Sequence, residues 1–292
     1  MITSNHIAEK LEVLKKSTEI NKSSHWETRL KGKKYGDIYI NLGFGSFEKK
    51  KFFKSILHFF FSRLLFGVKI FKSEEAKVYN SIFNKMNRQI DVDALRHIYT
   101  FNKLKNNFLP KKICIIGDGK ANFVLGCLKI FPKAQIYSVN LAEVLIHDYS
   151  IISKFNFIED ANIEVVLNKK DLENQNKKLF LIPSSNKSLL YDSNIDLFVN
   201  IVSFQEMNMK EIIEYFKIIK SNRSKLYACN REKKILSGGE VLKFKDYPWG
   251  NGKKIFEEDC PWHQKYYSFK PIFFHKYDGN IKHCLIDYST KT

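Results

Sequence analysis

Residues 111–140, KKICIIGDGKANFVLGCLKIFPKAQIYSVN, decide how this 292-residue chain folds. They open with the apolar run 113–116, whose length and composition are typical of a buried parallel strand. Gly117-Asp118-Gly119 then predicts a sharp turn, and apolar residues recur at helical spacing from Phe123 until Pro132 ends the pattern. A second strand is predicted over 135–139. The stretch therefore predicts strand, glycine turn, helix and strand, which is half of a nucleotide-binding unit.

The glycine turn has the features of a ligand site. Glycine lets the backbone come close to a ligand, and the following helix N-terminus offers N–H groups. A dinucleotide site also expects a third small residue and an acid at the end of the second strand. Ala121 lies near the position of the third small residue, and Asn140 occupies the position of the acid. An amide binds a ribose hydroxyl more weakly than a carboxylate, so an ordinary turn without a ligand stays an alternative.

The composition bounds the class of partner. Forty-nine Lys and Arg against 31 Asp and Glu give a net charge of +18, and 44% of the residues are hydrophobic, which allows a sizeable core. The positive charge favours anionic partners, such as nucleic acid, an acidic membrane surface or phosphorylated substrates. The alternative is that AT-biased coding has raised the number of lysines, and that these lysines are simply solvated on the surface.

The cysteines indicate a reducing environment. Their number is odd and none forms a CxxC pair; they are Cys114, Cys127, Cys229, Cys260 and Cys284. We expect reduced, mostly buried thiols and neither a disulfide framework nor a metal site. Residues 1–20 alternate between polar and apolar, so no signal peptide is predicted and a cytoplasmic location is expected.

The N-terminal part, 1–104, is predicted to be a mainly helical extension or lid, followed by one sheet domain over 105–292. A short amphipathic helix is expected over 5–17. His25-Trp26 either lines a pocket or anchors a flap. Residues 49–72 are too interrupted by charges to span a bilayer; packing in the core or at a homodimer contact is favoured over peripheral membrane contact. Two helices follow over 73–102, the second starting near Asp91.

Beyond residue 140 the pattern alternates between helices and strands. Helices are predicted over 141–155 and 209–221, strands over 178–183, 194–203 and 225–230, and a loop over 162–176. Aromatic runs around 247–249, 266–274 and 284–288 predict final, partly antiparallel strands.

Several segments then resemble a known family. IIGDGKANF (115–123), VNLAEVLIHDY (139–149), DLFVNIVSFQEM (196–207), YACNRE (227–232) and DYPW (246–249) are similar to class I S-adenosylmethionine-dependent methyltransferases, and within these to the sugar O-methyltransferase family of bacterial surface-glycan clusters. The resemblance implies an α/β, Rossmann-like fold with a mixed, mostly parallel seven-stranded sheet and helices on both faces. It implies methyl transfer from S-adenosylmethionine to a sugar or sugar-derived acceptor, anionic or nucleotide-activated, in capsule or surface polysaccharide biosynthesis. The chain departs from the pattern at Ile115 and Asn140, where the family carries acids.

The resemblance and the strand ends together select the site residues. In an open α/β sheet the ligand lies beyond the carboxyl ends of the strands. The predicted cofactor-binding residues are Gly117, Asp118, Gly119, Asn140, Leu141, Ser203, Phe204 and Gln205. The predicted acceptor-binding residues are Trp26, Asn230, Arg231, Tyr247 and Trp249.

Glu206 is the first candidate for the base that takes the acceptor's proton, or for a ligand of the acceptor hydroxyl, because it follows the fourth strand directly. The alternative is that Glu206 caps the helix that begins near Asn208. His263 and Asp246 are the other candidate catalytic residues.

The sequence leaves two alternative functions open. The net charge favours a nucleic-acid methyltransferase, but the lysines are scattered, so no nucleic-acid partner is expected. Ile115 and Asn140 favour a non-catalytic binding module that has lost its cofactor site.

Overall fold

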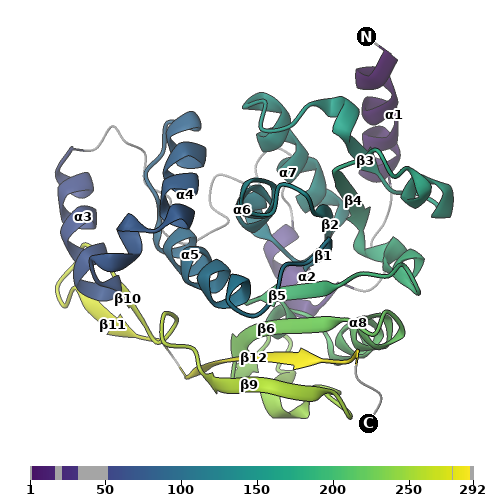
Figure 1. The fold of residues 1–292 in the computed structure, drawn as a ribbon. Helices are drawn as coiled ribbons and strands as arrows, with labels where there is room; N and C mark the ends of the chain where they lie inside the picture. Colours follow the sequence, from purple (N-terminus) through teal and green to yellow (C-terminus); the bar gives the residue numbers. More distant parts are fainter. Residues whose placement is uncertain (1, 17–21, 32–51, 278, 290–292) are drawn as a thin grey trace.

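The computed structural model, which describes residues 2–16, 22–31, 52–277 and 279–289, centres on one eight-stranded sheet (Figure 1). The strands lie in the order β3-β4-β2-β1-β5-β6-β12-β9. All pairs from β3 to β6 are parallel, whereas β12 runs antiparallel to both of its neighbours. The bounds are β1 Lys112–Ile116, β2 Gln135–Asn140, β3 Ile163–Val165, β4 Leu179–Pro183, β5 Leu197–Ile201, β6 Lys225–Arg231, β9 Lys253–Asp259 and β12 Ile281–Asp287. The predicted mixed, mostly parallel α/β fold is confirmed.

The number of strands differs from the prediction. The sheet has eight strands rather than seven. The additional strand is β3, which lies inside the segment 162–176 that we predicted as a loop and pairs with β4. A three-residue strand is too short for its alternation to stand out. Residues 266–274 were expected in the same sheet but contribute to a separate hairpin of β10 (Lys265–Tyr267) and β11 (Phe274–Lys276). Residues 247–249 form no strand.

Helices cover both faces of the sheet, which explains the unbroken apolar run in β1. Ile113 and Ile115 belong to one core, and Cys114 and Ile116 belong to the core on the opposite face. The first core contains residues from α1 (Ile2–Lys16), α4 (Glu74–Lys85), α5 (Val92–Lys105), α6 (Asn122–Ile130) and α7 (Ala142–Lys154). The second contains residues from α8 (Met209–Ser221).

Local capping sets where the helices begin. The carboxylate of Asp91 accepts the Ala94 amide at 2.9 Å, so α5 starts where the sequence predicts. Helices α4 and α5 share the first core with the sheet, and the ring of Phe101 stacks on Phe123 with centroids 4.4 Å apart. Packing therefore continues across residue 104, and a separate N-terminal unit stays a prediction.

Helix α3 (Phe52–Phe66) packs beside the β10–β11 hairpin (Figure 1). The ring of Phe61 lies 5.7 Å from Tyr267 and 5.4 Å from Phe274. The opposite side of α3 exposes Phe53 and Phe60 to solvent. Part of the predicted segment 49–72 lies outside the described residues, and its membrane or dimer contact stays a prediction. Within the described ranges, no helix is both long and apolar enough to cross a bilayer.

Candidate active-site cavity

A cavity of about 540 Å³ opens at the carboxyl ends of β1, β2 and β5, where ligands bind in open parallel sheets. Its walls bring together most of the predicted site residues, although these are far apart in the sequence. The predicted residues that line it are Trp26, Gly117, Asp118, Gly119, Asn140, Leu141, Ser203, Gln205, Glu206, Arg231 and His263. Phe204, Asn230, Asp246, Tyr247 and Trp249 do not line it.

The two glycines of the turn have different surroundings. Gly117 has a left-handed φ of +77°, and a Cβ placed there would lie 1.8 Å from the Ser203 hydroxyl oxygen. Gly119 has no atom of the described residues within 4 Å of the corresponding position. Because Gly119 also lines the cavity, its missing side chain leaves open space there. Gly117 is therefore constrained by its neighbours, whereas a side chain at position 119 would extend into open space of the cavity.

Asp118 stabilises the helix that follows the turn. Its carboxylate accepts the Val124 amide at 2.8 Å, near the start of α6. Burial raises the pKa of Asp118 to about 7, against the opposing effect of hydrogen bonds from backbone amides. The carboxylate is thus committed to the protein's own backbone.

Asn140 ties the end of β2 to the glycine turn. Its amide nitrogen donates to the Asp118 carbonyl at 2.6 Å, and its oxygen accepts the Leu141 amide at 3.0 Å. An acid at this position has no N–H to donate to the Asp118 carbonyl. The departure from the family pattern therefore has a structural role here.

A network of buried amides joins the ends of β1, β5 and β6. Asn200 donates to the Ile116 carbonyl at 3.1 Å, and Asn230 donates to Asn200 at 2.9 Å. The Gln205 amide donates to Asn230 at 3.2 Å, and the Gln205 side chain accepts the Arg231 amide at 2.7 Å. Asn230 is fully buried. Its predicted role in acceptor binding is corrected to that of a link between strands, and Asn200 is a site-supporting residue that the sequence analysis missed.

Glu206 lies at the wall of the cavity beside the N-terminal segment. Its carboxylate oxygen is 3.5 Å from Nε2 of His25, and the Ser23 hydroxyl donates to its backbone carbonyl. The cap of α8 is Asn208, whose side chain accepts the Glu211 amide at 2.9 Å. The alternative that Glu206 caps this helix is therefore wrong.

Residues 22–26, at the start of α2 (Ser24–Leu30), close one side of the cavity. Lys22 bonds the carboxylate of Glu143 on α7 at 2.5 Å, and Ser24 bonds Glu240 at 2.9 Å. Both His25 and Trp26 line the cavity, as one of the two sequence interpretations expected. The pairing of His25 with Glu206 was not foreseen, because it joins residues 181 positions apart.

The charge of the cavity wall is mixed. Its acidic and basic residues, apart from histidines, are Lys22, Asp91, Asp93, Arg96, Asp118, Lys120, Glu206, Glu211, Arg231 and Lys234. Five of these are acidic and five are basic, so the net charge of +18 is not concentrated here. Burial lowers the pKa of Lys120, and burial with the neighbouring Asp93 raises the pKa of Asp91 to about 6.

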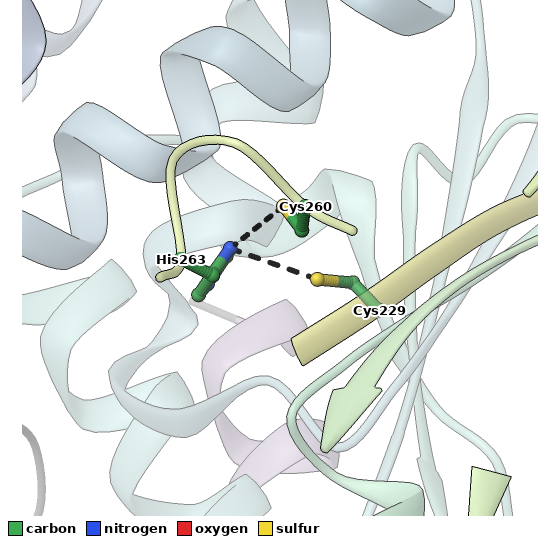
Figure 2. A group of neighbouring side chains, drawn as sticks. All are labelled: Cys229, Cys260 and His263. Carbon is green, nitrogen blue, oxygen red and sulfur yellow. Dashed lines mark hydrogen bonds between the residues drawn. The ribbon is translucent and has the colours of Figure 1, made fainter. Parts of the chain in front are cut away.

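His263 reaches the cavity wall but is turned toward two sulfur atoms. Its Nδ1 lies 3.2 Å from Sγ of Cys260 and 3.6 Å from Sγ of Cys229 (Figure 2). The side chain is almost fully buried, and burial lowers the pKa of His263. Its predicted role as the alternative base stays untested.

The DYPW segment lies away from the cavity, which corrects three predicted positions. Asp246 is exposed, whereas Tyr247 is buried with its ring 5.9 Å from that of Phe204. Trp249 donates its indole N–H to the Phe244 carbonyl at 2.9 Å. These rings, with Phe204, fill the core beneath α8. Burial of aromatic surface in the core explains this segment without a ligand.

Comparison with known proteins adds only a distant likeness. No protein-family model matches the sequence, and the search of curated proteins found no match. Among solved structures, the chain is similar to the methyltransferase domain of the bacterial protein CtHen1 (14% identity, 66% of this chain and 97% of that chain, TM-score 0.40). It is also similar to an S-adenosylmethionine-dependent methyltransferase from Aquifex aeolicus (13%, 63% and 87%, 0.41) and to the pyocyanin biosynthetic protein PhzM (9%, 64% and 53%, 0.39). The fold assignment rests on the strand order of the protein itself.

Proposed function

We propose that the protein is an S-adenosylmethionine-dependent O-methyltransferase that acts on a small, hydroxyl-bearing acceptor. The observation that carries this proposal is the cavity at the carboxyl ends of β1, β2 and β5, which is lined by the glycine turn and by the neighbouring Glu206 and His25. A pocket at this edge of an open α/β sheet is the expected place for a nucleoside-containing cofactor.

The residues of the cavity fit the cofactor. Its volume of about 540 Å³ lies within the range of small-molecule sites, about 300–1,000 Å³. Gly119 leaves open space beside the backbone of the turn, and Asn140 and Leu141 line the adjacent wall at the end of β2. When bound, the cofactor supplies an electrophilic methyl group on a positively charged sulfur.

The chain's own residues would then position the acceptor and take its proton. A displacement of this kind depends on holding the acceptor oxygen in line with the methyl group. Glu206 is suited to accept the hydroxyl proton, and His25 would orient its carboxylate from 3.5 Å away. Because His25 belongs to the segment that closes the cavity, residues 22–26 would act as a lid that completes the site.

For the acceptor we propose a sugar or sugar derivative with an anionic group, made for a surface polysaccharide. The sequence resemblance supports the sugar class. Arg231, which lines the cavity with its guanidinium carbon 5.7 Å from the Tyr277 ring centroid, supports the anionic group, because guanidinium matches carboxylates and phosphates. With five acidic residues in the same wall, we expect this attraction to be local to Arg231.

The first test is calorimetric titration with S-adenosylmethionine and its demethylated product. We expect saturable binding by the wild type and at least a roughly tenfold loss, about 1.4 kcal/mol, in Gly119→Val, whose side chain would enter the cavity. Asp246→Asn, an exposed change outside the cavity, is the control and should bind as the wild type. If the wild type binds neither compound, the protein is a non-catalytic module and the proposal fails.

The second test separates acceptor classes. Methyl transfer to matched neutral and phosphorylated sugars is assayed at low and moderate salt, because screening weakens a charge contact. We expect faster transfer to the phosphorylated sugar, and we expect Arg231→Ala to remove this advantage. The exposed Arg223→Ala is the matched control. Equal rates on both sugars, insensitive to Arg231→Ala, would exclude the anionic acceptor while leaving the methyltransferase proposal intact.

A further inference from the structure

Two cysteines and a histidine meet beside the cavity (Figure 2). Cys229 lies on β6, and Cys260 and His263 lie in the turn that follows β9. Both cysteines are fully buried and His263 is 3% exposed. Their sulfur and nitrogen atoms all lie within 4.8 Å of one another. None of the roles proposed above uses the two thiols.

The two separations between nitrogen and sulfur are close to the edges of a tetrahedral zinc site. Zinc binds thiolate sulfur at about 2.3 Å and imidazole nitrogen at about 2.0–2.1 Å, so ideal tetrahedral angles place sulfur and nitrogen about 3.6 Å apart. Here Nδ1 of His263 lies 3.6 Å from the sulfur of Cys229 and 3.2 Å from that of Cys260. An ion would therefore require only small adjustments of the side chains.

The surrounding backbone holds these ligands in place. The Cys260 amide donates to the Ile281 carbonyl at 2.8 Å, and the His263 amide donates to the Cys260 carbonyl at 3.1 Å. From α5, the buried Arg96 donates to the Trp262 carbonyl at 3.2 Å. These contacts fix the backbone that carries Cys260 and His263. The turn is thus fastened on both sides before any ion binds.

The chemistry of the three atoms favours a soft divalent cation. Thiolate and imidazole are the ligands that zinc prefers, and a set of two cysteines and one histidine leaves a fourth position for a small ligand. Because His263 also lines the cavity, the cluster borders a route to solvent.

We propose that Cys229, Cys260 and His263 bind one zinc ion, which joins β6 to the turn after β9. The proposal is independent of the methyltransferase proposal, because it rests on the geometry of these three residues. It replaces the expectation from the sequence that the chain has no metal site. That expectation followed from searching for CxxC pairs, which passes over the spacing of a cysteine and a histidine in Cys260-Pro261-Trp262-His263.

The test uses the full-length protein, purified under reducing conditions and then stripped with a chelator. Titration with zinc should reach one ion per chain and raise the melting temperature. Cobalt in its place should give the charge-transfer absorption of a cobalt–thiolate bond. Cys260→Ala and His263→Gln should weaken zinc binding by more than the 10–100-fold that loss of an outer partner costs. Cys127→Ala, a buried cysteine on α6 outside the cluster, should bind as the wild type.

The wild-type titration decides the proposal even if a variant fails to fold. Absence of saturable zinc binding, or binding that survives both ligand substitutions unchanged, would overturn it. Mass spectrometry of the protein purified without reductant tests whether Cys229 and Cys260 form a disulfide. A chain lighter by two hydrogens, with the linkage between Cys229 and Cys260, would mean that the pair forms a disulfide instead of holding a metal.

Discussion

Replacing Gly117 with alanine tests whether this glycine, rather than Gly119, is the one that the fold requires. Gly117 follows β1 with φ +77°, and its amide donates to the Val139 carbonyl at 2.9 Å. A methyl group there would lie 1.8 Å from the Ser203 hydroxyl oxygen and 2.5 Å from its Cβ. The substitution therefore combines an unfavourable backbone conformation with a steric overlap.

The expected cost can be built from these two parts. A left-handed conformation costs a non-glycine residue about 1–2 kcal/mol. Overpacking of a tight site typically costs about 1–3 kcal/mol. We therefore expect Gly117→Ala to lower the free energy of unfolding by about 2–5 kcal/mol, and Gly119→Ala, which meets no atom of the described residues within 4 Å, to change it by less than about 1 kcal/mol.

Urea denaturation of the two variants measures the difference, and a double variant separates its parts. Changing Ser203 to glycine removes both overlapping atoms, so Gly117→Ala in that background should retain only the backbone cost. The coupling between the two sites should then be about 1–3 kcal/mol. Equal stabilities of Gly117→Ala and Gly119→Ala, or no coupling to Ser203, would refute the reasoning.

Three further predictions follow from named contacts. Glu206→Gln should lower turnover by roughly 100-fold or more with little change in cofactor affinity, measured by methyl transfer and calorimetry; unchanged turnover would contradict its role as base. Asp118 has a folded-state pKa of about 7 against an ordinary 3.8, so it binds its proton more tightly when folded, and its share of stability is lost as pH rises from about 4 to 7. In the Asp118→Asn variant this fall in the free energy of unfolding, about 1.4 kcal/mol per pH unit at most, should be absent from melting curves recorded across that pH range. The same pH dependence of stability in the variant and the wild type would contradict the prediction. Lys10 donates to the carboxylates of Glu164 and Asp171 at 2.6 Å each in a partly buried site, so Lys10→Met should cost about 1.5–3 kcal/mol in urea denaturation, and a loss below about 0.5 kcal/mol would show that these ion pairs contribute little.

Much of the architecture is readable from local sequence. The apolar run 113–116, the glycine turn and the helical spacing after Phe123 predict β1 and α6 correctly, because burial on both faces and backbone capping act over a few residues. Asp91 predicts the start of α5 for the same reason. The short strand β3 was missed, since three residues carry too little periodicity.

The site was only partly predictable. Residues at or just beyond the end of a strand, such as Asn140 and Ser203, reach the cavity because parallel strands end at one edge of the sheet. Tyr247 and Trp249 carry the chemistry of a sugar site but pack under α8, because large aromatic side chains serve a core equally well. Residue type alone does not distinguish these two uses.

The sequence by itself determined the order of most helices and strands between residues 73 and 231, the turn after β1 and the edge of the sheet where the cavity opens. Only the tertiary structure decided that Gly117 faces Ser203, that His25 meets Glu206, and that Cys229 lies beside Cys260 and His263. The physical reason is the separation along the sequence over which each kind of interaction acts. Capping and hydrophobic periodicity depend on neighbours within a few residues, whereas these contacts join segments far apart in the sequence, which only the packing of strands and helices brings together.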